Sequence, residues 1–230
     1  MNKIGINTFL FTSPFTNESI EWFPKFKSWG FDTVEIAVED PDILDASIIK
    51  DALIKNGLEC QSICAAMGPD RDLRGDDEQQ NTSLTYIKKT IDFMEKIGAD
   101  LLVGPIYSSV GRAEFVSPED YKIQQSLVVK HLKDLSAYAE QKSVKLAVEP
   151  LNRFETDFLN TCDQALELLR LVDSNNLYIH LDTFQMNIEE KDLGAAIIKA
   201  GSKLALLHTC GNDRGTPGKD HTNWRGIAKL

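Results

Sequence analysis

Alternation of strand-like and helix-like segments is the feature that most constrains the fold of this chain. Apolar runs typical of buried strands occupy residues 3–11, 31–38, 59–67, 99–107, 145–151, 177–186 and 203–210. Helical patterns separate them at 22–29, 45–55, 83–97, 118–141, 161–172 and 193–200, and one more helix begins at 224. Strict alternation predicts a parallel sheet covered by helices, because parallel strands need crossover connections and are buried on both faces.

The spacing of the strands favours a closed barrel over an open sheet. Strand starts at residues 3, 31, 59, 99, 145, 177 and 203 are typical of a (β/α)8 barrel of about 250 residues. A doubly wound open sheet is the alternative, but no strand is followed by a glycine-rich dinucleotide turn. We therefore predict an α/β fold of the TIM-barrel type, forming a single domain over residues 1–230 and lacking the eighth β/α unit.

Composition excludes several classes of partner and location. The net charge of −10 argues against nucleic-acid or anionic-membrane partners. No apolar run approaches the roughly 20 residues that span a bilayer. The N-terminus reads as a first strand because it lacks the cleavage site of a signal peptide. Four scattered cysteines, Cys60, Cys64, Cys162 and Cys210, indicate reduced thiols and a cytoplasmic protein.

Ligand-type side chains stand at the ends of three successive predicted strands. Glu149 directly follows Leu146 to Val148, Asp182 lies near the end of the sixth strand, and His208 lies near the end of the seventh. The carboxyl ends of barrel strands carry the catalytic groups, and neighbouring strands are only about 4.8 Å apart. Two carboxylates and an imidazole suit Mn²⁺, Co²⁺, Mg²⁺ or Fe²⁺ better than a thiolate site would.

Each of these residues has a simpler structural interpretation when taken alone. Glu149 alone can form a salt bridge with Arg153 at a strand end that surfaces into a polar loop. Asp182 alone can cap a helix or form a turn, and His208 alone can be a hydrogen-bonded core histidine. The coincidence at three equivalent strand ends favours a metal site over three independent structural roles.

Three segments carry a specific resemblance to a known family. VEPLNRFE (148–155), HLDTFQMNIEE (180–190) and HTCGNDRGTPGKDHTNW (208–224) resemble the ketose 3-epimerases, the D-tagatose and D-allulose 3-epimerase group of the xylose-isomerase-like superfamily. The resemblance implies a divalent ion, Mn²⁺ first and Co²⁺ or Mg²⁺ as alternatives, held by Glu149, Asp182 and His208. It also implies a sugar substrate contacted by Glu155 and Arg214, and a dimer or tetramer of identical chains.

The sequence departs from the family pattern at two places. The family has a histidine three residues after its metal-binding aspartate, where this chain has Gln185, which can form hydrogen bonds but carries no charge. We still expect Gln185 to lie in the cavity beside Glu155. The family's fourth ligand and second acid/base is a glutamate on an eighth strand, which residues 1–230 do not include. We therefore expect the 230-residue chain alone to be a poor epimerase.

The resemblance implies an isomerase of carbohydrate metabolism that epimerises a free ketose at C3. Glu149 would be one of the two carboxylates that remove and return the C3 proton through a cis-enediolate, while Glu155 and Arg214 orient O1 and O2. One alternative is a related enzyme acting on a sugar phosphate, hydroxypyruvate or an inosose; a phosphate would need an anion site, for which Lys219 with Arg225 is the candidate. Another alternative is a barrel without catalytic activity or an inactive fragment.

Overall fold

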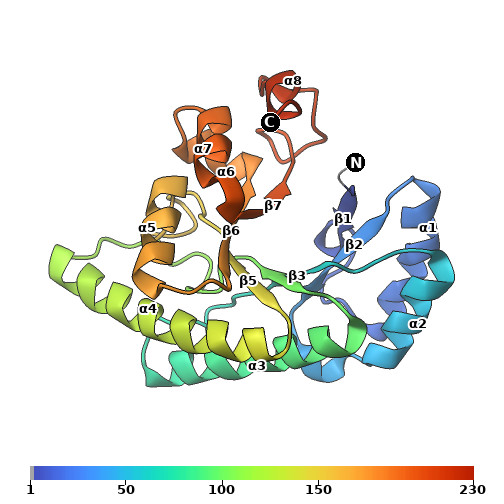
Figure 1. The fold of residues 1–230 in the computed structure, drawn as a ribbon, viewed down its shortest axis with the longest axis horizontal. Coiled ribbons are helices and arrows are strands. Elements are labelled where there is room, and N and C mark those ends of the chain that lie inside the picture. The colour runs from blue at the N-terminus through green and yellow to red at the C-terminus, as the bar shows by residue number, and fades with distance from the viewer. Residues whose placement is uncertain (1–2) are drawn as a thin grey trace.

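A single parallel sheet of seven strands forms the centre of the computed structural model, which describes residues 3–230. The spatial order of the strands is their order in the sequence, and every neighbouring pair is parallel. They are β1 (Gly5–Asn7), β2 (Thr33–Val38), β3 (Ser62–Ala65), β4 (Leu101–Val103), β5 (Lys145–Val148), β6 (Leu177–Asp182) and β7 (Leu204–His208). The sheet curls as in a TIM barrel, which confirms the predicted fold class (Figure 1).

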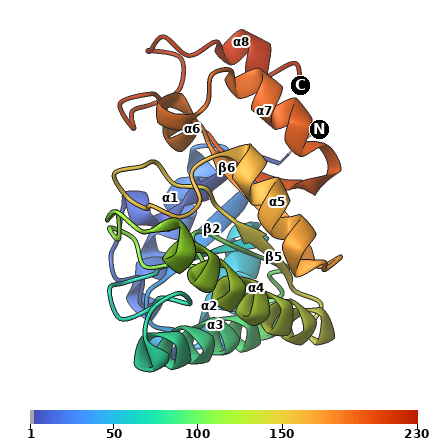
Figure 2. The same ribbon diagram turned by 90° about the vertical axis from the view of Figure 1, so that its left-hand side faces the viewer.

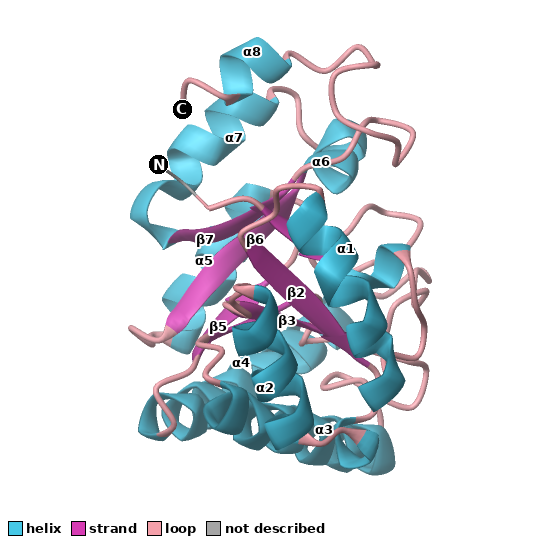
Figure 3. Ribbon diagram, turned by 90° about the vertical axis from the view of Figure 1, so that its right-hand side faces the viewer, coloured by secondary structure: helices cyan, strands magenta, loops and turns pink. Residues whose placement is uncertain are grey.

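Eight α-helices accompany this sheet within residues 3–230, and most of them cover its outer face (Figures 2 and 3). They are α1 (Phe23–Ser28), α2 (Ala46–Asn56), α3 (Asp77–Ile97), α4 (Pro118–Gln141), α5 (Cys162–Val172), α6 (Thr183–Glu189), α7 (Leu193–Ala200) and α8 (Trp224–Ile227). Short 3-10 turns occupy Thr8–Leu10, Asn17–Trp22, Pro41–Ile43 and Gly201–Lys203. Helices α3 and α4 run side by side under the strands, while α6, α7 and α8 lie at the opposite end of the molecule.

Successive side chains of each strand point alternately to the helix-covered outer face of the sheet and to the interior of the barrel. On β2, Val34, Ile36 and Val38 are fully buried in the layer between sheet and helices. Ala37 belongs instead to a small inner cluster with Ala147 of β5 and residues of β3 and β4. Side chains of a strand point alternately to its two faces, so Glu35 shares the inner face with Ala37. The inner face lines a cavity of about 1620 Å³.

Strands β1 and β7 form the two edges of the sheet within residues 3–230. All five residues of β7 are only half-buried, whereas all six residues of β2 are buried. Figure 1 shows β1 and β7 separated at the open side of the curl, near the N-terminal end of the chain. The interior cavity is lined by residues of both edge strands, so it extends across this opening.

Three predicted segment boundaries were wrong, each because a side chain caps a helix. The sixth strand ends at Asp182 and not at residue 186, since the Asp182 carboxylate accepts hydrogen bonds from the first backbone amides of α6. Helix α3 begins at Asp77 and not at Ser83, because Asp76 and Gln79 form a reciprocal capping box. Strand β1 is short because Asn7 caps the turn that follows it.

No helix among residues 3–230 is both long and apolar enough to cross a membrane. The four cysteines predicted to be reduced form no disulfide, and Cys60, Cys64 and Cys162 are buried while Cys210 is half-buried.

Candidate metal and substrate site

The carboxyl ends of β5, β6 and β7 bring the three predicted ligand-type residues to the same edge of the sheet. Glu149 is the first residue after β5, Asp182 is the last residue of β6, and His208 is the last residue of β7. Asp182 and His208 are direct partners in the register of β6 and β7. All three line the interior cavity, and because the three strands are parallel, their positions at the strand ends put them at the same end of the barrel.

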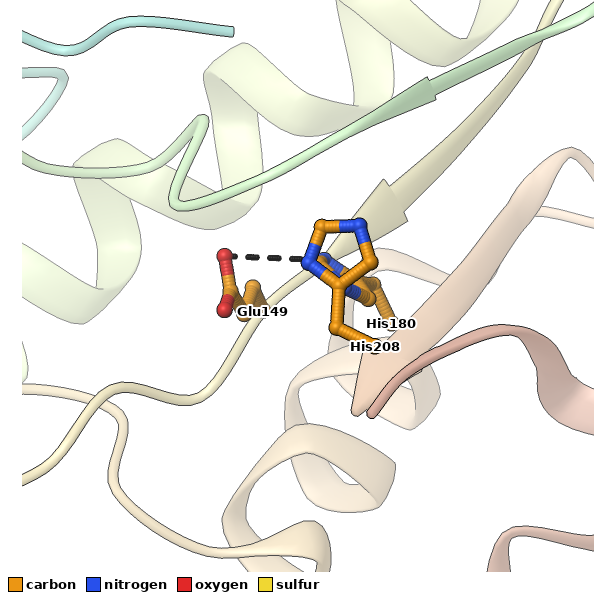
Figure 4. A group of neighbouring side chains, drawn as sticks. All are labelled: Glu149, His180 and His208. Atoms are coloured by element: carbon orange, nitrogen blue, oxygen red, sulfur yellow. Dashed lines mark ion pairs between the residues drawn. The ribbon is translucent and has the colours of Figure 1, made fainter. Parts of the chain in front are cut away.

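The side chains of these residues approach one another closely around His208. Nδ1 of His208 lies 3.9 Å from Oδ2 of Asp182. Potential ligand atoms of Glu149, His180 and His208 all lie within 4.8 Å of one another (Figure 4). The rings of His180 and His208 meet edge to face with centroids 4.0 Å apart. The structure therefore adds His180 to the three residues named from the sequence.

Asp182 has a structural role as well as a place in this cluster. Its Oδ1 accepts hydrogen bonds from the backbone amides of Phe184, at 2.6 Å, and Gln185, at 3.4 Å, and so caps α6. The capping interpretation of Asp182 was thus a valid one, but it uses only one oxygen. Oδ2 is the oxygen that faces His208. One carboxylate can therefore fix the turn after β6 and still present an oxygen to a ligand.

Burial and like charge strongly perturb the carboxyl group of Glu149. Burial, together with the charges of Asp182, Glu35 and Glu155, raises the pKa of Glu149 to about 8, against the lowering effect of His208. The suggested salt bridge to Arg153 does not form, because Arg153 makes a bidentate pair with Glu189 at 2.9 Å. Within residues 3–230, the positive charge that lowers the pKa of Glu149 is that of the His208 imidazole.

The two histidines of the cluster have opposite pKa shifts. Burial alone lowers the pKa of His208, but the charge and hydrogen bond of Glu35, with Glu149 and Asp182, raise it to about 9. Burial and the charge of His208 hold the pKa of His180 well below its usual range. The 3.5 Å contact between Nδ1 of His180 and Oε2 of Glu149, dashed in Figure 4, therefore joins two groups that are neutral at pH 7.

His180 is fully buried, and neither of its ring nitrogens has a hydrogen-bond partner among the described residues. A buried polar atom without a hydrogen-bond partner usually signals a bound water or ion, or a functional role. His180 was not among the residues predicted from the sequence. The available signal was a histidine two positions before Asp182 on the same strand, because side chains two apart share a face.

This donor set fits a divalent cation. Glu149 and Asp182 supply carboxylate oxygens, and Nδ1 of His208 points toward Asp182. Clustered carboxylates raise one another's pKa, and a cation held between them offsets that repulsion. The raised pKa of Glu149 and the unpaired nitrogens of His180 are both what a site arranged for a cation would show.

A second polar group lies beside this cluster and contains the three residues predicted to contact substrate. Nε2 of Gln185 donates a hydrogen bond to Oε2 of Glu155 at 3.0 Å, and Nη2 of Arg214 donates to Oε1 of Glu155 at 2.6 Å. The guanidinium of Arg214 also lies 4.0 Å above the ring of Phe184. Oε1 of Gln185 accepts a hydrogen bond from the backbone amide of Asn152 at 2.8 Å. All three predicted residues line the cavity, and Gln185 lies beside Glu155.

Comparison with known proteins adds an independent observation. The model of the xylose isomerase-like TIM barrel family matches residues 23–230. The chain is 36% identical to a probable ketose 3-epimerase of Synechocystis sp. over 96% of its own length and 77% of that protein. Its structure is similar to that of an L-ribulose 3-epimerase, with a TM-score of 0.91, 28% identity, and coverage of 99% of this chain and 76% of the other.

A D-psicose 3-epimerase from Clostridium cellulolyticum H10, solved with D-tagatose, is similar with a TM-score of 0.88 and 25% identity. That match covers 99% of this chain and 80% of the other chain. The shared fold therefore extends over almost all of the described residues.

Proposed function

The chain belongs to the xylose isomerase-like TIM barrel family, and we propose that within it the protein acts as a ketose 3-epimerase. The observation that carries the proposal is the cavity at the carboxyl ends of β5, β6 and β7. There Glu149, Asp182 and His208 lie beside the hydrogen-bonded group of Glu155 and Arg214. A cluster of side chains that could bind a metal ion, next to a group of polar hydrogen-bonding side chains, suits a polyhydroxylated substrate with a carbonyl group.

Glu149, Asp182 and His208 would hold the divalent ion, for which we propose Mn²⁺, with Co²⁺ or Mg²⁺ as alternatives. Carboxylate oxygens and an imidazole suit these ions better than thiolates would. The nearby Cys210 donates its thiol hydrogen to Oδ1 of Asp182, and burial raises the pKa of that thiol to about 11. When bound, the ion would act as a Lewis acid that polarises the C2 carbonyl of the ketose and makes the C3 proton removable.

Glu149 is the group that we assign to proton transfer at C3. A general base works best when its pKa lies near the operating pH, and burial and like charge have already raised the pKa of Glu149 to about 8. A bound cation would favour the ionised carboxylate, and it would therefore lower the pKa of Glu149 from about 8 toward pH 7. Inverting C3 requires a second acid on the opposite face of the sugar, which the family resemblance assigns to a glutamate of an eighth strand.

Glu155, Gln185 and Arg214 would orient the substrate. Their donors and acceptors are already paired with one another, which fixes their side chains before a sugar binds. Ordered polar groups of this kind reduce the entropy lost on binding, and they favour a single orientation of O1 and O2. We assign the contact with the carbonyl end of the ketose to Glu155 and Arg214.

A free ketose fits the cavity better than a phosphorylated sugar. Neither Lys219 nor Arg225, the suggested anion site, lines the cavity, and both side chains are exposed. Of the cationic side chains that do line it, Arg214 is paired with Glu155 and Lys3 with Glu59. Lys145 also lines it, but it begins β5, at the opposite end of that strand from Glu149. We further propose that the chain is one domain, that it acts in the cytoplasm, and that it assembles as a dimer or tetramer, as the family resemblance implies.

The proposal is tested by incubating the protein with D-fructose, D-tagatose and L-ribulose in the presence of Mn²⁺. Because residues 1–230 do not include the second acid that the family resemblance implies, we expect the C3 epimer of at least one ketose to form only slowly, and we expect EDTA to abolish its formation. Chromatography separates C3 epimers from C4 epimers and aldoses. Formation of only an aldose or a C4 epimer would assign the site to a different reaction of the same family.

A further inference from the structure

His208 forms a close contact across the interior of the barrel with a residue of a distant strand. Its Nε2 lies 2.7 Å from Oε1 of Glu35, which belongs to β2, the neighbour of the other edge strand β1. Glu35 is only 6% exposed, although it is charged and stands on the inner face of a strand. A buried carboxylate is unfavourable unless it is hydrogen-bonded, so this contact calls for a specific explanation.

Neighbouring strands hold the carboxylate of Glu35 in place. Nδ2 of Asn7 on β1 donates to Oε1 at 2.7 Å, and Oγ of Ser62 on β3 donates to Oε2 at 2.6 Å. Asn7 and Glu35 are direct partners in the register of β1 and β2. Both oxygens of Glu35 are therefore occupied, and its orientation is fixed from two sides independently of His208.

This arrangement determines which nitrogen of His208 carries a proton when the ring is neutral. A carboxylate only accepts hydrogen bonds, so Nε2 of His208 must be the donor. The lone pair is then on Nδ1, the nitrogen that faces Oδ2 of Asp182. Metal-binding histidines commonly donate their other ring N–H to a carboxylate, which fixes both the tautomer and the orientation of the ring.

We propose that Glu35 is a positioning residue that holds His208 with its proton on Nε2 and its Nδ1 directed into the metal site. The inference rests on the proposed metal site and extends it to a residue that touches neither the ion nor the sugar. Glu35 does not itself suit the role of a ligand, because its oxygens are engaged with Asn7, Ser62 and His208. The strands β1, β2 and β3 thereby contribute to a site whose ligands come from β5, β6 and β7.

Titration calorimetry of Mn²⁺ into the metal-free protein tests this role. We expect Glu35→Ala to weaken Mn²⁺ binding by about 10- to 100-fold, as loss of such a partner typically does. Glu35→Gln should weaken binding less. Asn7 and His208 both donate to Oε1 of Glu35, so the amide oxygen of Gln should take this position and still accept from His208. Glu21→Gln, which removes an exposed carboxylate, is the matched control and should bind as the wild type does.

A second measurement reports the tautomer directly. In the Zn²⁺-loaded wild type, we expect the ¹⁵N spectrum of His208 to show the proton on Nε2. Circular dichroism establishes which variants fold. If Glu35→Ala does not fold, several-fold weaker Mn²⁺ binding by a folded Glu35→Gln supports the positioning role of Glu35. Wild-type affinity in the folded Glu35 variants, or a proton on Nδ1, would overturn it. A wild type that binds no Mn²⁺ would instead overturn the metal site itself, and the role of Glu35 with it.

Discussion

Replacing Glu149 with Gln should stabilise the metal-free protein at neutral to alkaline pH, even though it removes a functional group. The ionised form of Glu149 is disfavoured by burial and by the charges of Asp182 and Glu35. Gln has nearly the same shape but no charge, so the folded state no longer has to accommodate a buried anion. The gain should vanish at acidic pH, where Glu149 is already protonated and neutral.

The magnitude follows from the difference between the folded and unfolded pKa values of Glu149. Its pKa is raised from 4.5 to about 8 on folding, and each pKa unit is worth about 1.4 kcal/mol. Because the folded pKa is the higher one, the stability linked to Glu149 is fully present below pH 4.5 and is lost as the pH rises through about 8. The total loss in the wild type is on the order of 5 kcal/mol.

His208 changes stability in the same direction over a higher range of pH. Its pKa is raised from 6.5 to about 9, so its contribution is present below pH 6.5 and lost as the pH rises through about 9. Glu149→Gln leaves most of this contribution in place, since Glu35 is its main source. The difference between variant and wild type therefore isolates Glu149.

Urea unfolding in EDTA, repeated from about pH 5 to about pH 9, measures this difference. We expect the free energy of unfolding of Glu149→Gln, relative to wild type, to rise by a few kcal/mol across that range. Glu21→Gln, at an exposed position, should run parallel to the wild type. Parallel pH profiles for Glu149→Gln and wild type would refute the claim that burial and like charge raise the pKa of Glu149.

Three further predictions concern individual side chains. Asp182→Asn should weaken Mn²⁺ binding but keep the cap of α6, whereas Asp182→Ala should also lose the cap and about 1 kcal/mol of stability in metal-free urea unfolding. If calorimetry shows that both variants bind Mn²⁺ as tightly as the wild type, Asp182 is not a ligand. Gln185→His should change kcat/KM among ketoses, because Gln185 positions Glu155; an unchanged profile over several sugars would argue against a substrate role. Arg214→Lys should raise KM, because Lys cannot stack on Phe184 and donate to Glu155 in the same way; an unaltered KM would remove Arg214 from the site.

Much of the fold and the site could be predicted because both depend on local sequence patterns. Strand ends are marked by the change from apolar to polar residues, and in a parallel barrel all carboxyl ends lie at one rim. Glu149, Asp182 and His208 could therefore be placed together without knowing any contact. The same patterns did not predict α6, because the apolar run continues to Met186 and was read as a strand. The cap that Asp182 provides starts a helix at Thr183 instead.

Contacts across the barrel were not predictable in this way. Glu35 and His208 are separated by 173 positions in the sequence, and nothing local to either residue indicates the other. The signal for Glu35 was a single carboxylate inside the apolar run of β2. His180 was equally inconspicuous, because a histidine in a buried strand is commonly a core residue that finds a hydrogen-bond partner.

Deuterium exchange at C3 of a ketose tests the central claim most directly, because it reports proton removal without requiring inversion. The Mn²⁺-loaded protein would be incubated with D-fructose in D₂O and the sugar examined by NMR. We predict that deuterium enters at C3, and that Glu149→Gln slows its entry by about 10²- to 10⁴-fold. Exchange at C1 or C4, or exchange at C3 that is as fast in Glu149→Gln as in the wild type, would contradict the account.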